Sequence, residues 1–121
     1  MKKILIVDDE KDILAVLGKR LTAAGYSVLT ANSGYDALTI ARSTLPDLII
    51  LDIVMPIMEG GEVAEKLKEY PLTRNIPVIY ITALLSKTEE AKDNHIVADN
   101  ITFAKPVDTE ELLACIEKLL L

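Results

Sequence analysis

The sequence predicts an α/β domain in which a parallel sheet is covered by helices on both faces, giving three layers. Two kinds of segment alternate along the chain: short β-branched apolar runs, and longer stretches whose apolar residues recur every three or four positions. The short runs are almost continuously apolar, as in parallel strands buried on both faces. Right-handed crossovers and a count of five strands favour the doubly wound order 2-1-3-4-5 over the six-stranded dinucleotide-binding order.

Five apolar runs are the predicted strands of this sheet. Each holds only four or five residues and is rich in β-branched side chains. They span Lys3 to Val7, Tyr26 to Thr30, Asp47 to Leu51, Val78 to Ile81 and Ile101 to Ala104.

Five helices are predicted to cover the sheet. The first carries an apolar stripe from Ile13 to Ala24 and stops at Gly25, a predicted C-cap. The second follows Ser33, a predicted N-cap, and continues through Arg42.

The remaining helices follow the third, fourth and fifth strands. One spans Gly61 to Tyr70 and ends at Pro71, and the last begins at Asp108, with Glu111 three residues on. Residues Ser86 to Asn94 are almost wholly polar, so a helix there has little to bury and is expected to be the least stable.

The length and charge of the chain limit what it can be. Its 121 residues suit one compact domain spanning residues 1 to 121. With 13 basic against 19 acidic side chains, its formal charge of −6 opposes direct binding to nucleic acid. Because no apolar run approaches the ~20 residues of a membrane span, we expect a cytoplasmic protein that does not bind membranes.

Polar side chains follow four of the predicted strands at the point where each ends. Taken singly, each has a structural explanation, such as an aspartate that caps the next helix. Together they favour one site, because ligands of doubly wound sheets bind beyond the carboxyl ends of the strands. The residues are Asp8, Asp9 and Glu10 after the first strand, Asp52 after the third, Thr82 and Ala83 after the fourth, and Lys105 and Pro106 after the fifth.

Three carboxylates are expected to crowd together at this edge. Asp8, Asp9 and Asp52 follow strands that are neighbours in the predicted order, so they repel one another unless a cation neutralises them. Lys105 supplies one positive charge. Carboxylate oxygens at a partly open edge suit Mg²⁺, which keeps several waters and binds a few carboxylates plus a phosphate.

Four motifs carry a resemblance to a known family. "ILIVDDE", "PDLIILDIVMP", "VIYITA" and "FAKP" occur in this order and together resemble the receiver domain of two-component response regulators over essentially the whole chain. The resemblance implies a flavodoxin-like fold and a phosphorylation-dependent signalling switch rather than a metabolic enzyme. It also implies a phosphohistidine donor, either a sensor histidine kinase or a histidine phosphotransfer protein, and output through protein docking.

The resemblance also implies roles for individual residues. Asp52 is the implied phosphoacceptor. Asp9 is implied to bind Mg²⁺ directly and Asp8 to bind it through water, with the backbone carbonyl of Val54 as a further ligand. These roles agree with the chemistry of carboxylates, since a carboxylate can attack phosphorus in line and form an acyl phosphate.

Further implied roles concern the phosphoryl group itself. Thr82 and Lys105 are implied to bind phosphoryl oxygens, where the lysine neutralises charge. Ala83 is implied to leave space for the phosphate, because its side chain is small. The bond between Lys105 and Pro106 is expected to be cis.

The chain departs from the family pattern at one position of the last strand. An aromatic residue is common three positions before the lysine and moves inward as the threonine binds phosphate, whereas this chain has Thr102 there. Phe103 is one residue later, so the alternation of strand side chains directs it to the opposite face of the sheet. Coupling through this switch position is therefore expected to be modified, weak or absent unless a bulge shifts the register.

The chain also departs from the family pattern beside the phosphoacceptor. Polar residues that orient a hydrolytic water often stand two positions after the phosphorylated aspartate and two after the threonine, where this chain has Val54 and Leu84. Neither side chain can hydrogen-bond a water, so a slowly hydrolysing acyl phosphate is expected.

Four functions are compatible with parts of this pattern, and the residues favour them unequally. The chain is either a single-domain regulator, which an initial Met1 favours, or the receiver part of a longer DNA-binding regulator or hybrid kinase, with which the apolar end "EKLLL" agrees. An Asp-nucleophile phosphatase needs a second acid where Val54 stands. A flavodoxin-like electron carrier needs a glycine- and hydroxyl-rich loop where this chain has "DDEKD".

Overall fold

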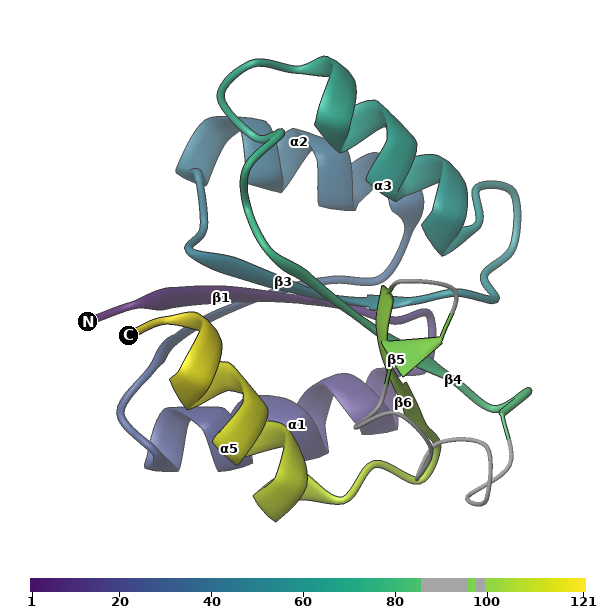
Figure 1. Cartoon of the computed structure of the whole chain (residues 1–121). Coiled ribbons are helices and arrows are strands. Elements are labelled where there is room, and N and C mark those ends of the chain that lie inside the picture. The colour runs from purple at the N-terminus through teal and green to yellow at the C-terminus, as the bar shows by residue number, and fades with distance from the viewer. Residues whose placement is uncertain (86–95, 98–99) are drawn as a thin grey trace.

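A computed structural model describes residues 1–85, 96–97 and 100–121. Five parallel strands, in the predicted order, form the body of the sheet (Figure 1). They are β1 (Lys3–Val7), β2 (Ser27–Ala31), β3 (Leu48–Asp52), β4 (Val78–Thr82) and β6 (Asn100–Ala104), where β6 is the predicted fifth strand. A two-residue strand that the sequence did not predict, β5 (Ile96–Val97), pairs antiparallel with β6, and the sheet order is β2-β1-β3-β4-β6-β5.

Four helices are present in the described residues, and they form the two outer layers. The helices α2 (Gly34–Thr44) and α3 (Gly60–Glu69) cover one face of the sheet, while α1 (Lys11–Ala23) and α5 (Thr109–Leu119) cover the other (Figure 1). The helix predicted between Ser86 and Asn94 lies outside the described residues. None of the described helices is long and apolar enough to cross a membrane.

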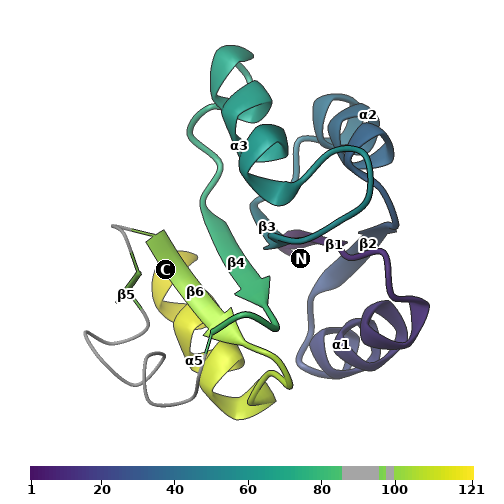
Figure 2. The ribbon, with the colours of Figure 1, turned by 90° about the vertical axis from the view of Figure 1, so that its right-hand side faces the viewer.

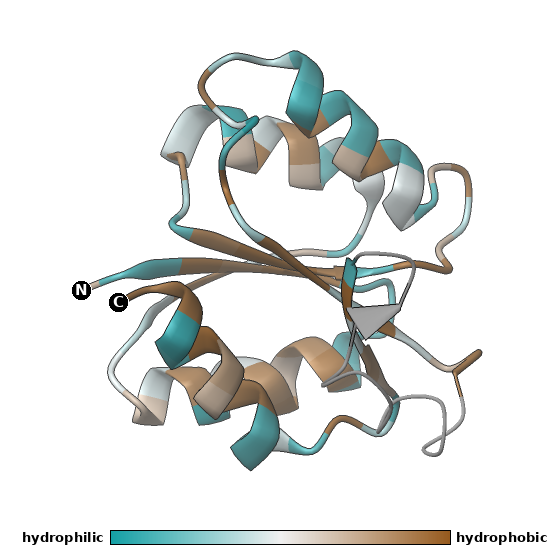
Figure 3. Cartoon of the chain, viewed as in Figure 1, coloured by the Kyte–Doolittle hydropathy of each residue, from teal (hydrophilic) through white to brown (hydrophobic). Residues whose placement is uncertain are grey.

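The strands bury side chains on both faces, so the domain has two cores. Along β1, Leu5 and Val7 pack beneath α2 and α3, whereas Ile4 and Ile6 pack against α1 and α5. All five residues of β3 are buried. In Figure 3 the sheet is predominantly hydrophobic, while hydrophilic residues mark the outer sides of the helices. The near-continuous apolar runs therefore correspond to strands covered on both sides.

Helix ends follow the capping residues in the sequence. The Ser33 hydroxyl accepts a hydrogen bond from the backbone N–H of Asp36 at 3.2 Å, and the Asp108 carboxylate accepts from two N–H groups in the first turn of α5. Gly25 lies one residue beyond the C-cap Ala24 and has a φ of 98°, a conformation that glycine adopts without steric penalty.

The register of the sheet brings the carboxyl ends of the central strands together. Asp52 of β3 is paired with Ile81 of β4, and Thr82 of β4 is paired with Ala104 of β6. Figure 2 looks onto this edge of the sheet. The residues that follow β1, β3, β4 and β6 are thus held close to one another by backbone pairing.

The loop after β3 is fixed against the strand end by buried groups. Met55 and Met58 are 4% and 2% exposed, and the backbone N–H of Gly60 donates to the carbonyl of Ile53 at 2.9 Å. A Cβ atom on Gly60 would lie 2.2 Å from the backbone oxygen of Asp52. Only glycine fits there, and it keeps the start of α3 in contact with the end of β3.

This contact predicts opposite effects for two adjacent glycines. We expect Gly60→Ala to lower the free energy of unfolding by about 2 kcal/mol or more, because the backbone at Asp52 has to move. Gly61→Ala is the matched control: its Cβ meets nothing within 4 Å, and alanine favours the helix by up to about 1 kcal/mol. Urea denaturation of both variants measures the difference, and similar losses in both would contradict the role of Gly60.

Candidate functional site at the carboxyl edge of the sheet

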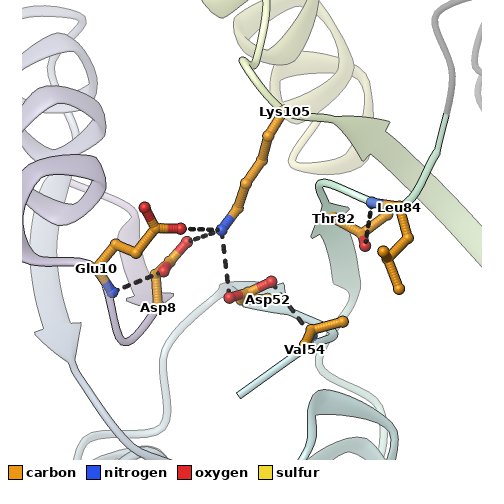
Figure 4. Close-up of polar contacts among 7 residues, drawn as sticks. All are labelled: Asp8, Glu10, Asp52, Val54, Thr82, Leu84 and Lys105. Atoms are coloured by element: carbon orange, nitrogen blue, oxygen red, sulfur yellow. Dashed lines mark hydrogen bonds and ion pairs between the residues drawn. The ribbon is translucent and has the colours of Figure 1, made fainter. Parts of the chain in front are cut away.

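The centre of the site is the ammonium group of Lys105, which contacts three carboxylates (Figure 4). Its Nζ lies 2.8 Å from Asp8 Oδ2, 3.0 Å from Glu10 Oε1 and 3.3 Å from Asp52 Oδ2. The lysine side chain is only 10% exposed. An ammonium group that is shielded from water in this way screens its acidic neighbours more strongly than a surface lysine does.

Backbone hydrogen bonds orient the two buried carboxylates. The N–H of Glu10 donates to Asp8 Oδ1 at 2.9 Å, and the N–H of Val54 donates to Asp52 Oδ1 at 3.3 Å. Asp9, which is exposed, completes the acidic group: one carboxylate oxygen from each of Asp8, Asp9 and Asp52 lies within 4.8 Å of the others. This set of hard oxygen ligands at a partly open edge fits a Mg²⁺ ion.

Burial acts in opposite directions on the pKa values of Asp52 and Lys105, yet both pKa values are raised. Burial, followed by the negative charge of Asp8, raises the pKa of Asp52 to about 6, although Lys105 acts to lower it. Burial acts to lower the pKa of Lys105, but hydrogen bonds to Asp8 and Glu10 and the charge of Asp52 outweigh it, so the pKa is raised. Three acids share one ammonium group, so the lysine is well neutralised and Asp52 is not.

The other side of the site is formed by the end of β4. Thr82 is 5% exposed, and its hydroxyl accepts a hydrogen bond from the N–H of Leu84 at 3.1 Å. Its carbonyl accepts from the N–H of Lys105 at 2.9 Å, which connects β4 to the turn after β6. Ala83 is exposed, and the peptide bond that follows Lys105 is cis, as expected.

Two apolar side chains stand at the mouth of the site. Val54 is 46% exposed and Leu84 is 80% exposed, and in Figure 4 they lie beside Asp52 and Thr82. The backbone N–H of Val54 donates to the side chain of Asp52, and the backbone N–H of Leu84 donates to the side chain of Thr82.

The residues before Lys105 alternate between the two faces of the sheet. Thr102 is 4% exposed and lines a groove of about 350 Å³ together with Tyr80 and Thr82. Phe103 is fully buried on the other face, in the core beneath α1 and α5. Pairing of β4 with β6 is continuous from Tyr80 to Thr82, so the register does not shift there.

Two residues of the site have roles that the sequence did not reveal. The sequence places Glu10 among the acids after β1 but does not indicate that it contacts Lys105. Gly60 stands in a pair of glycines, and the sequence does not distinguish the one that approaches Asp52 from the one that is free. Glu10 and Lys105 are 95 residues apart in the chain, and Gly60 approaches Asp52 only because the loop after β3 folds back on the strand end.

Comparison with known proteins agrees with this geometry. The family model of the response regulator receiver domain matches residues 4–117, and the chain belongs to this family, a class of signalling module in two-component systems. The chemotaxis protein CheY4 of Vibrio cholerae has a similar structure, with a TM-score of 0.84, 31% identity and 99% coverage of both chains. A putative response regulator from Chloroflexus aurantiacus gives a TM-score of 0.83 at 30% identity, covering 98% of this chain and 97% of that one.

Curated relatives are longer than this chain. The response regulator PleD of Caulobacter vibrioides is 41% identical over 117 residues, which are 97% of this chain and 26% of PleD. The alkaline phosphatase synthesis transcriptional regulatory protein PhoP of Bacillus subtilis is 35% identical over 98% of this chain and 48% of its own length. The chain thus spans between a quarter and a half of these relatives.

The raised pKa of Asp52 predicts a pH-dependent gain in stability on its neutralisation. In metal-free buffer we expect Asp52→Asn to raise the free energy of unfolding by about 2 kcal/mol above pH 6. The gain should shrink as the pH falls from about 6 toward 3.8, the ordinary value, because the native carboxylate then takes up a proton. Urea denaturation at several pH values measures this.

Glu65→Gln, on the exposed side of α3, is the control for the loss of one negative charge. A gain for Asp52→Asn that persists unchanged below pH 4, or one that Glu65→Gln reproduces, would contradict the assignment.

Proposed function

We propose that the chain is a phosphorylation-dependent switch in which Asp52 accepts a phosphoryl group from a phosphohistidine donor in a Mg²⁺-dependent reaction. The observation that carries the proposal is the position of Asp52: a nearly buried carboxylate at the end of β3, 3.3 Å from the Lys105 ammonium group and within 4.8 Å of two further acids. A sensor histidine kinase or a histidine phosphotransfer protein is the proposed donor.

Asp52 has the properties of a nucleophile for this transfer. With a pKa of about 6 in the metal-free protein, Asp52 is mostly ionised at neutral pH, and the ionised carboxylate is the form that can attack phosphorus. An oxygen of Asp52 attacks phosphorus, the acyl phosphate bond forms, and the bond to the donor imidazole nitrogen breaks. The departing nitrogen keeps the electron pair of the broken bond, and because the other nitrogen of the donor ring carries a proton, the histidine leaves as neutral imidazole.

The proposed cation site uses the acids that the structure brings together. Asp9 and Asp52 would hold Mg²⁺ directly and Asp8 would hold it through water, with the backbone carbonyl of Val54 as a fourth proposed ligand. When bound, Mg²⁺ neutralises negative charge on the phosphoryl oxygens. Asp8 is held by the Glu10 N–H, so the chain supplies an oriented ligand before any cation arrives.

Lys105 and Thr82 are the proposed partners of the phosphoryl oxygens, with Ala83 leaving the approach open. Lys105 exchanges Asp52 for a phosphoryl oxygen, and the Thr82 hydroxyl donates a hydrogen bond after rotating away from the Leu84 N–H. At the proposed switch position, Thr102 cannot supply the volume of an aromatic side chain. We therefore propose that a movement of Thr82 affects the protein surface without the inward movement of an aromatic side chain that is common in the family.

We further propose that residues 1 to 121 form a single domain, that the protein is cytoplasmic and that this chain does not bind nucleic acid directly. The curated relatives are longer than this chain, so an output domain attached to the receiver is the second proposed arrangement. The phosphatase alternative is disfavoured, because Val54 offers no acid at the position where that chemistry needs one.

Phosphorylation by a small donor tests the proposal directly. After incubation with acetyl phosphate and Mg²⁺, intact-mass spectrometry is expected to show the gain of one phosphoryl group. The gain should disappear in Asp52→Asn and in the presence of EDTA. Absence of an adduct under every condition would mean that the site is a binding module whose signal does not depend on phosphate.

The apolar mouth of the site predicts a long-lived acyl phosphate. We expect little loss of the phosphoryl group within seconds in Mg²⁺ buffer, because Val54 and Leu84 cannot hydrogen-bond a hydrolytic water. Val54→Asn and Leu84→Gln together should speed dephosphorylation by about tenfold, as expected for one oriented water. Leu72→Gln, an exposed leucine in the loop after α3, is the control, and an equal acceleration in that variant would contradict the explanation.

A further inference from the structure

Glu10 is an acid at the start of α1 whose side chain does not cap the helix. It is the N-cap residue, a position where the shorter side chains of Ser, Thr, Asp and Asn commonly accept a hydrogen bond from the first turn, and its own side chain makes no such bond. Instead Oε1 lies 3.0 Å from Nζ of Lys105, which is 95 residues later in the chain. The side chain is 60% exposed, so this contact forms at the mouth of the site.

The other two acids that contact Lys105 differ from Glu10 in one respect. Asp8 and Asp52 belong to the group of carboxylates that can hold a cation, whereas Glu10 does not. A divalent cation bound to Asp8 and Asp52 repels an ammonium group that lies about 3 Å from the same carboxylates. Lys105 must then give up part of its contact with both, and Glu10 is the acidic partner that it retains.

We propose that Glu10 is a positioning residue that holds the Lys105 ammonium group at the mouth of the site while Asp8 and Asp52 bind the cation. The inference rests on the proposed function and extends it. Glu10 prevents the lysine from being displaced into solvent, and it keeps the ammonium group beside the path by which a phosphoryl group enters. Glu10 itself contacts neither the cation nor the phosphoryl group.

This role predicts a specific coupling between Glu10 and Lys105. Without Glu10 the displaced ammonium group has no acidic partner in the cation-bound protein, but it still has Asp8 and Asp52 in the cation-free protein. Removing Glu10 therefore costs the cation-bound state more than the cation-free state, and Mg²⁺ binds more weakly. A plain electrostatic attraction between Glu10 and Mg²⁺ has the same sign, so the test must separate the two explanations.

A double-mutant cycle makes that separation. The dissociation constant for Mg²⁺ is measured by isothermal titration calorimetry for the unmodified chain, Glu10→Gln, Lys105→Met and the double variant. We expect Glu10→Gln to weaken Mg²⁺ binding by about fivefold when Lys105 is present and to have no effect when Lys105 is replaced by Met. Asp12→Asn removes one charge from the exposed first turn of the same helix and should leave binding unchanged.

The other outcomes overturn the inference. Equal weakening in both backgrounds would mean that Glu10 acts on the cation directly, and no weakening in the presence of Lys105 would mean that Glu10 has no role in binding. If the unmodified chain binds no Mg²⁺, the proposed function fails together with the inference, which distinguishes that case from the first two.

A second measurement does not depend on replacing Lys105. In a crystal structure of the Mg²⁺ complex, Nζ of Lys105 should stay within hydrogen-bond distance of Glu10 and move away from Asp52. An ammonium group that leaves Glu10 for solvent would overturn the inference.

Discussion

The Lys105 ammonium group lies within 3.3 Å of three carboxylates that come from β3 and from the turn between β1 and α1. These charges can share a nearly buried space only if the segments that carry them are held in register, and the parallel sheet does this through backbone pairing. Gly60 also helps to hold Asp52 in place, because it lets α3 begin in contact with the backbone of Asp52. The parallel sheet thus holds several negatively charged side chains close to one another at its carboxyl edge.

Burial and the balance of charge at this edge together explain why the pKa values of both Lys105 and Asp52 are raised. Among the described residues, Lys105 contacts three acids, and these three acids share its single ammonium group. The charge of the lysine is therefore compensated more fully than the charge of each acid. Asp52 is less fully neutralised, and burial, followed by the negative charge of Asp8, raises its pKa to about 6. A bound divalent cation would relieve this excess of negative charge, which is the proposed role of Mg²⁺ at the site.

The sequence predicted the sheet order and the acids of the site for a simple physical reason. Apolar runs such as Leu48 to Leu51 can be buried on both faces only in a covered parallel sheet, and the residue after such a run must lie at its carboxyl edge. The direction of the Glu10 side chain was beyond this reasoning, because an N-cap acid can turn toward its own helix or away from it. The strand β5 was missed as well, since a two-residue pairing leaves no periodic pattern in a sequence.

The groove beside Thr102 has a consequence for how this protein can be observed. The chain contains four tyrosines and no tryptophan, so tyrosine emission is not lost by energy transfer to an indole ring. Tyr80 lines the groove two residues before Thr82 on the same strand, and burial raises the pKa of its phenol. A rearrangement of the Thr82 side chain would alter the surroundings of that ring, so the protein carries an intrinsic optical reporter directly beside Thr82.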